Sequence, residues 1–345
     1  MWLISLRDLQ WRRRRFIIAV FATGLVFGIT LLLSGINASF QNEINHTVGS
    51  FDASGWIVPT AAAGPFTSSA AFPAALARQV ARTPGVHEAD PMVVTRVTLA
   101  GATPTDLIVF GTVIHGIGPQ ATSGRDARRP GEMVVDSSLG KAVGQVIAVG
   151  GRQFHIVGTY SGNTVFAGQP TAVVPIQDAR AISFDGEPLA TSVVVRGLPS
   201  HPPAGFQVLT PNQAAGDLRR PIKSAQGTIG FLNVLLWVIA AGIIGSIVYL
   251  TVIERTRDFA VLKATGFASG MLFLSLAVEA IVIALAAAIV AIVFAFALHG
   301  ALPLQVAIGT GTYVALVGIA VAVGIIASLV GLRRAVGVDP ALAFG

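Results

Sequence analysis

Four long apolar runs set the strongest limit on how this 345-residue chain can fold. They cover residues 16–36, 229–253, 271–298 and 306–332. Each reaches or exceeds the roughly 20 residues that a helix needs to cross the hydrocarbon core of a bilayer. Only 12% of the residues are charged, about half the share of roughly 25% in soluble proteins. The chain is therefore predicted to be an α-helical membrane protein with four transmembrane helices.

The first apolar run has the basic flank of a secretory signal peptide, so cleavage has to be considered. Its length of about 20 residues exceeds the apolar core of a signal peptide, which is about 7–15 residues long. Small residues near its end, Ser34 and Ala38, leave a cleavage site open. We predict a retained anchor.

The distribution of basic residues predicts the topology. Ten of them flank the spans: Arg7, Arg12, Arg13, Arg14, Arg15, Arg255, Arg257, Lys263, Arg333 and Arg334. The long segment between the first two spans, residues 37–228, is almost neutral with 13 bases and 12 acids. The turn at 299–305, between the third and fourth spans, has no Lys or Arg. Because cytoplasmic flanks carry the basic excess, both termini are predicted to be cytoplasmic, in a bacterial inner membrane. The net charge of +6 then needs no nucleic acid.

The two ends of the chain are short cytoplasmic segments in this topology. Residues 1–15 place Trp2, Leu3, Leu6 and Leu9 at helical spacing ahead of the arginine run. Such a pattern predicts an amphipathic helix in the membrane interface. Residues 333–345 form the cytoplasmic tail.

Residues 37–228 are predicted to form a large mixed α/β extracytoplasmic domain between the first two transmembrane helices. Predicted strands are residues 92–99, 107–111, 132–135, 145–149, 153–157, 172–174 and 192–195, and predicted helices are 72–83 and 178–183. Gly150-Gly151 is a hairpin signal between two of these strands. Residues 60–71 and 116–131 are predicted loops. The proline-rich segment 197–205 is a candidate link between two lobes, and the number of lobes stays open.

No catalytic or metal-binding pattern emerges from this domain. Its histidines are His46, His87, His115, His155 and His201, and none lies in a zinc-binding helix motif. A nucleophile elbow of the G-x-S-x-G type is absent from the sequence, and Ser137-Ser138 after Asp136 is interpreted as a helix cap. There is no cysteine and no G-x-x-x-x-G-K-[ST] phosphate loop. We predict a non-enzymatic chain that binds no cofactor, so that any ATP, with its Mg²⁺, is hydrolysed by another polypeptide.

The segment between the second and third spans, residues 254–270, combines charges with apolar residues. It begins Glu254-Arg255-Thr256-Arg257-Asp258-Phe259 and continues through Leu262, Lys263 and Gly266. Charge balance alone would need neither the two acids nor the two large apolar residues. We predict a cytoplasmic helix that offers an apolar stripe to a soluble partner.

The sequence of this segment resembles the FtsX-like permeases, the membrane subunits of MacB- and LolC/E-type ABC transporters, which are related to the DevC permeases. Their pattern E-R-x-R-E-I-x-x-L-[KR]-A-x-G is matched by Glu254, Arg255, Arg257, Asp258, Leu262, Lys263, Ala264 and Gly266. Gly131 to Val135, the glycine-flanked hairpin after it, and the ending Arg333-Arg334 to Asp339-Pro340-Ala341 are also similar. The resemblance covers nearly the whole chain, except that a MacB polypeptide carries a fused ATPase.

The resemblance implies a permease subunit that works with a separate dimeric ABC ATPase and a second copy of itself. A periplasmic or cell-wall partner is also implied. The residues expected to couple the chain to the ATPase are Glu254, Arg255, Arg257, Asp258, Phe259, Leu262, Lys263 and Gly266. Apolar residues would be buried at the interface, and Lys263 and Arg257 would pair with acids of the ATPase.

Glu279 is an acidic residue inside the third span. An intramembrane carboxylate faces a bundle interior or a functional path by default. A structural hydrogen bond and a proton-transfer role are both open. Small-residue pairs such as Gly24 and Gly28, or Gly242 and Gly245, allow close helix packing and only weakly indicate a dimer face.

Three functions remain in competition. The first is an ABC permease that exports an unidentified substrate, and the second is an FtsX-like subunit that signals to a cell-wall hydrolase. The third is an ion-coupled carrier that uses Glu279. The carrier is disfavoured because four spans with one acid and no inverted repeat do not build a midplane site.

Overall fold

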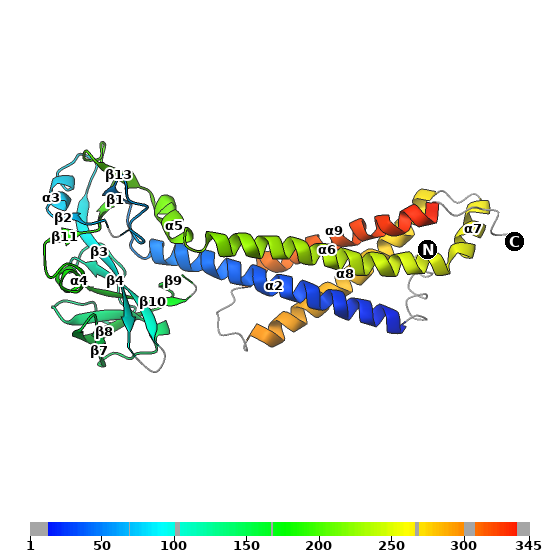
Figure 1. Cartoon of the computed structure of the whole chain (residues 1–345), viewed down its shortest axis with the longest axis horizontal. Helices are drawn as coiled ribbons and strands as arrows, with labels where there is room; N and C mark the ends of the chain where they lie inside the picture. The colour runs from blue at the N-terminus through cyan, green and yellow to red at the C-terminus, as the bar shows by residue number, and fades with distance from the viewer. Residues whose placement is uncertain are drawn as a thin grey trace. The chain divides into compact units, whose positions relative to one another are not determined.

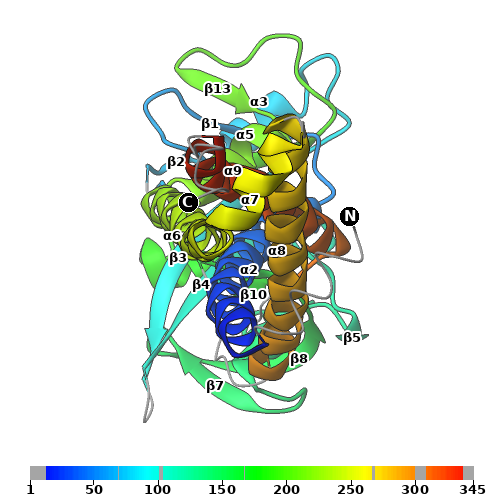
Figure 2. The same ribbon diagram turned by 90° about the vertical axis from the view of Figure 1, so that its right-hand side faces the viewer.

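The computed structural model describes residues 13–68, 70–100, 104–166, 168–265, 269–299 and 308–336. The chain divides into two compact units, Met1–Ser39 with Ala225–Gly345, and Phe40–Ser224. Figures 1 and 2 show the first as a set of long helices and the second as a sheet with short helices.

Among the residues that the structure describes, four helices are long and apolar enough to cross a membrane, and most of each lies in the first unit. They are α2 (Arg13–Gly49), α6 (Lys223–Glu254), α8 (Ser269–His299) and α9 (Thr310–Val336). This agrees with the four predicted transmembrane helices. α2 continues beyond the predicted end of the first span at residue 36, and α6 begins ahead of residue 229. α2 and α6 are longer than their apolar runs because polar residues can extend a helix once it leaves the membrane.

Small residues bring the long helices close together. The packed side of α8 is a seam of alanines, Ala280, Ala284, Ala287, Ala288, Ala291 and Ala295, all buried. On α2, a Cβ added to Gly24 would lie 2.7 Å from Val290 Cγ1, and one added to Gly28 would lie 2.6 Å from Phe294 Cδ1. These two glycines therefore contact α8 of the same chain, which is the close backbone approach that small residues permit.

The second unit is built on a mixed sheet with strand order β13-β1-β12-β3-β4-β10-β6-β8-β5, with β7 paired to β8 and β9 paired to β10. The bounds are β1 Gly55–Pro59, β3 Glu88–Leu99, β4 Thr105–Thr112, β5 Ser123–Gly124, β6 Glu132–Asp136, β7 Val146–Val149, β8 Arg152–Tyr160, β9 Thr164–Val165, β10 Gln169–Pro175, β12 Ser192–Arg196 and β13 Phe206–Leu209. A separate pair joins β2 (Phe72–Pro73) to β11 (Leu189–Ala190). Four short helices complete it: α3 Leu76–Val80, η1 Ser137–Leu139, α4 Ile176–Ser183 and α5 Pro211–Arg219. The mixed α/β domain expected between the first two long helices is confirmed.

Alternating side chains divide the core between the two faces of the sheet. In β4, Ile108 and Phe110 pack in one cluster with the last turns of α2 and with α5, whereas Leu107 and Val109 pack in another with α4. This is the period of two that a strand imposes. At the Gly150-Gly151 turn, Val149 pairs with Arg152, and both glycines have positive φ. The predicted hairpin is confirmed.

Two sequence-based expectations about this unit are wrong. The helix predicted over residues 72–83 is reduced to α3, because Phe72 pairs as a strand with Ala190 and its ring packs on Phe206. Residues 197–205 do not link two lobes, since β12 and β13 on either side of them both pair with β1 in one sheet. Tertiary pairing overrides the local pattern in both places.

Candidate functional site

The predicted coupling segment forms a separate short helix, α7 (Thr256–Ala264), between α6 and α8. Figure 2 shows it leaving the end of α6. The Thr256 hydroxyl donates hydrogen bonds to the carbonyl oxygens of Val252, at 3.1 Å, and Ile253, at 2.7 Å. These bonds tie the first turn of α7 to the last turn of α6, so Arg255 alone separates the two helices. A short connection of this kind fixes where α7 starts relative to α6.

Two ion pairs lie around the α6–α7 connection. Arg15 of α2 donates to Glu254 at the end of α6, with an Nη1 to Oε1 distance of 2.7 Å. Arg255 Nε lies 3.7 Å from Asp258 Oδ2, three positions along the chain. Exposed pairs of this type contribute at most about 1 kcal/mol. The main consequence of the first pair is positional, since it holds Arg15 of α2 beside the end of α6.

The side chains along α7 divide into a packed part and an exposed part. Ala260 is fully buried, while Arg257, Asp258 and Val261 are exposed. Phe259, Leu262 and Lys263 lie on the α7 backbone, and Gly266 lies outside the described residues. Residues 1–12 of the predicted N-terminal helix and residues 337–345 of the predicted tail lie outside them too. α7 thus exposes charge and an apolar side chain beside a buried alanine.

Glu279 of α8 takes part in a hydrogen bond between two of the long helices. The Thr251 hydroxyl of α6 lies 3.2 Å from Glu279 Oε1 and 3.0 Å from the Ile247 carbonyl oxygen. Thr251 is buried. This geometry supplies the intramembrane carboxylate with a protein donor and fits the structural role that the sequence left open.

The last turns of α2 carry polar contacts that the sequence did not reveal. His46 Nδ1 lies 2.9 Å from Asn163 Oδ1, and the Thr47 hydroxyl donates to the Thr164 carbonyl oxygen at 2.9 Å. Arg219 of α5 donates to Gln41 at 3.0 Å and to Asn45 at 3.1 Å. Both contacts lie inside the second unit and fix residues 40–49 against its sheet and α5. The partners are more than 100 positions apart, so no local pattern signals them.

Elsewhere in the second unit, Asp136 binds two backbone N–H groups. Asp136 Oδ1 accepts from Ser138 N at 2.9 Å and so caps η1, whereas Ser137 and Ser138, which were predicted to be the cap, lie inside that helix. Asp136 Oδ2 accepts from Asn163 N. In the part of the chain that the structure describes, His, Asp and Glu form no group of three that could hold a metal ion.

Family comparisons agree with this arrangement of units. Residues 17–204 match the MacB-like periplasmic core domain, and residues 230–340 match the FtsX-like permease C-terminal domain. Two proteins of Mycobacterium tuberculosis, each named as an uncharacterized ABC transporter permease, are 40% identical to this chain over 343 residues. The match covers 99% of this chain and 98% of each relative. The chain belongs to the ABC transporter permeases of the MacB/FtsX type.

Two solved structures similar to this permease are external domains. The extracellular domain of the noncanonic ABC-type transporter YknZ from Gram-positive bacteria is 14% identical with a TM-score of 0.33, covering 45% of this chain and 98% of that one. The periplasmic region of MacB from Actinobacillus actinomycetemcomitans is 10% identical with a TM-score of 0.34, covering 52% and 97%.

Proposed function

We propose that this permease works with a separate ATPase subunit that docks on α7, and that the ATPase drives movements of the second unit to extrude a substrate. The observation that carries the proposal is α7 itself, a short helix held between two candidate membrane spans with Arg257, Asp258 and Val261 exposed. An exposed helix that bears charge and apolar surface at the end of a membrane helix offers a docking surface to a soluble partner. The family implies an ATPase as that partner.

The proposed division of labour leaves this chain without a catalytic step. ATP and Mg²⁺ would be bound by the ATPase, because this sequence has no phosphate loop of the Walker A type. Here α7 would supply the docking surface. The Arg15–Glu254 pair and the Thr256 hydrogen bonds would hold it in place.

A mutational comparison on α7 tests the docking proposal. A buried apolar anchor typically contributes about 2 kcal/mol or more to an interface, and a charge at the rim contributes much less. Phe259→Ala/Leu262→Ala should therefore reduce co-purification of the ATPase and its stimulated activity more than Lys263→Ala does. The measurement is co-purification and ATPase activity in nonionic detergent or nanodiscs.

The matched control removes apolar surface from the second unit. Val143 and Val146 are 47% and 48% exposed, so Val143→Ala/Val146→Ala should leave both readouts unchanged. Membrane insertion should persist in all variants because the basic flanks remain. Wild-type co-purification and activity in Phe259→Ala/Leu262→Ala would refute the assignment and leave the α7 segment with a topological role only.

We also propose that the permease acts as a homodimer. One chain supplies one α7, whereas ABC ATPases act as pairs with two docking grooves. The mass of the complex purified with its ATPase should correspond to two permeases and two ATPases. One permease with two ATPases would contradict the proposal.

The proposed orientation places both termini and α7 in the cytoplasm and the second unit outside, in the bacterial inner membrane. Because the chain has no cysteine, single cysteines report position without background. In intact cells a membrane-impermeant maleimide should label Lys141→Cys and should not label Thr265→Cys until the cells are opened. The reverse pattern would invert the topology.

A further inference from the structure

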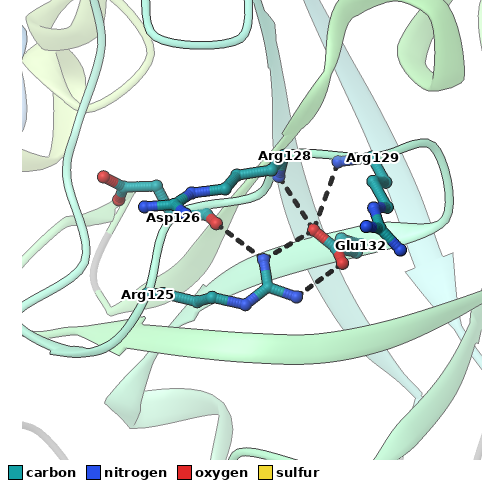
Figure 3. A network of polar contacts seen from close by, with 5 residues as sticks. All are labelled: Arg125, Asp126, Arg128, Arg129 and Glu132. Carbon is teal, nitrogen blue, oxygen red and sulfur yellow. Dashed lines mark hydrogen bonds and ion pairs between the residues drawn. The ribbon is translucent and has the colours of Figure 1, made fainter.

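A rigid arginine-bearing turn lies between β5 and β6 in the second unit. Glu132 accepts two hydrogen bonds from the Arg125 guanidinium, at 2.6 and 2.8 Å, and two from the backbone N–H groups of Arg128 and Arg129, at 2.8 and 3.2 Å (Figure 3). The Glu132 side chain is 13% exposed, so its carboxylate lies beneath the turn. A fork-to-fork pair of this kind is geometrically specific, and it holds the segment 125–132 in one shape.

A second carboxylate fixes the far end of the same turn. Asp178 of α4 is buried, and its Oδ2 accepts a hydrogen bond from the Gly131 N–H at 2.9 Å. Its Oδ1 lies 3.9 Å from Arg152 Nη2. Gly131 has φ +79°, a backbone conformation that a glycine adopts without strain. The carboxylates of Glu132 and Asp178 therefore both bind the inner side of the turn.

The guanidinium groups of this turn face solvent. We call Arg125, Arg128, Arg129 and Arg152 the arginine cluster; all four are exposed. Within the described residues, no hydrogen bond or ion pair engages the Arg128 or Arg129 guanidinium. Asp126 is an exposed acid of the same segment, and its Oδ1 accepts from Ala121 N. The surface therefore presents exposed arginines together with one exposed acid, Asp126, while the carboxylates of Glu132 and Asp178 bind backbone N–H groups of the turn.

The shape of the cluster discriminates between possible anions. Figure 3 shows the Arg128 and Arg129 side chains leaving the turn in opposite directions, so they do not converge on one small anion. Each guanidinium offers five N–H donors in a plane that matches a phosphate or carboxylate. The segment Arg-Asp-Ala-Arg-Arg-Pro-Gly-Glu has no aromatic or large aliphatic residue, so it lacks the anchor of a membrane-inserting helix. Successive oxyanions along an extended chain fit this arrangement best.

We propose that the arginine cluster is a docking surface for an extended oxyanionic polymer on the side of the membrane where the second unit lies. Glu132 and Asp178 act as positioning residues that preorganise the turn, and Arg128 and Arg129 make the contacts. The Arg125 hydrogen bonds lower the pKa of Glu132 to about 2, so its carboxylate stays ionised into the acid range. The proposal goes beyond the ATPase assignment and does not depend on it.

The test uses the full chain in nonionic detergent with long-chain inorganic polyphosphate as the probe. Ser123→Cys, labelled with a fluorophore, reports binding locally because the chain has no other cysteine. In this background, Arg128→Gln/Arg129→Gln should lower the affinity for polyphosphate about 10- to 30-fold. This is the effect of removing two arginines that each attract an anionic surface. The fold should be unchanged, since both backbone N–H groups remain.

The matched control removes the same charge elsewhere in the unit. Arg78 and Arg82, at and just after α3, are exposed, and Arg78→Gln/Arg82→Gln should change affinity less than about threefold, as expected for distant screened charges. Equal losses in the two double variants, or no response of the wild type to polyphosphate, would overturn the proposal. A response to phosphatidylglycerol vesicles without one to polyphosphate would also overturn it, and would assign the cluster to a bilayer surface.

Discussion

Replacing Asp217 with alanine should destabilise the second unit strongly. Asp217 lies in α5 with 1% of its surface exposed. Its Oδ2 accepts hydrogen bonds from the backbone N–H groups of Phe66, at 2.8 Å, and Thr67, at 3.0 Å, and its Oδ1 accepts from the Thr67 hydroxyl. The substitution leaves two backbone donors without their acceptor in a mostly buried place.

The expected cost follows from those contacts. A hydrogen bond to a charged group contributes about 1.5–3 kcal/mol, so two of them give a loss of roughly 3–6 kcal/mol. In a unit of roughly 150–250 residues each kcal/mol lowers the melting temperature by about 2–4 °C, which predicts a fall of roughly 10 °C. The Phe66 ring packs against Phe51, Trp56 and Phe110, with centroids 5.7–6.0 Å apart, so the same loss loosens the aromatic core.

The assay is thermal unfolding of the full chain in nonionic detergent, followed by tryptophan emission, to which the buried Trp56 contributes. Asp217→Asn keeps one acceptor oxygen and should fall between wild type and Asp217→Ala. Asp106→Ala is the matched control, because Asp106 accepts one exposed hydrogen bond from Thr98 at 2.7 Å. This substitution should lower the free energy of unfolding by less than about 0.5 kcal/mol. A melting temperature of Asp217→Ala equal to that of Asp106→Ala would refute the reasoning.

Three further predictions concern pH, packing and the intramembrane acid. The pKa of Glu132 in the folded state is lowered to about 2, so its stabilising effect is complete above its ordinary value near 4.5 and is lost as the pH falls from there toward 2. Melting temperatures of wild type and Glu132→Gln should therefore converge in acid, and parallel curves would contradict the assigned pKa. Gly24→Leu should lower the yield of folded protein in size-exclusion chromatography, because its Cβ alone would lie 2.7 Å from Val290 Cγ1. Gly242→Leu is the control, since no neighbouring heavy atom lies within 4 Å of a Cβ added there. Glu279→Gln should keep assembly and ATPase stimulation, because the amide still accepts a hydrogen bond, whereas near-complete loss of activity with normal assembly would indicate a protonation role.

The sequence alone determined the features that depend on neighbouring residues. Each membrane span is a continuous apolar run, because a helix in lipid satisfies its own backbone and needs only length and apolarity. The Gly150-Gly151 hairpin and the cap at Asp136 also depend on residues a few positions apart. The charged segment after residue 253 is predictable as a short helix for the same reason, although its docking role remains a proposal.

α5 is not among the predicted helices, although a local sequence signal marks its start. Thr210 and Gln213 form a reciprocal capping box with Pro211 between them, which is a recognisable helix start. Phe72 is the opposite case. Its helical spacing is genuine, yet the residue pairs with Ala190 in a strand, because burying its ring against Phe206 outweighs a weak local preference.

Only the tertiary structure decided which distant residues meet. Asp217 binds backbone groups about 150 positions away, and Arg219 reaches Gln41 and Asn45 at the end of α2. The turn that bears Arg128 and Arg129 likewise depends on Asp178 from α4, which accepts a hydrogen bond from the Gly131 N–H. Such contacts form only once the sheet has brought remote segments together. Hydrophobic periodicity indicates which face of an element is buried. It does not indicate which polar partner a particular side chain will contact there.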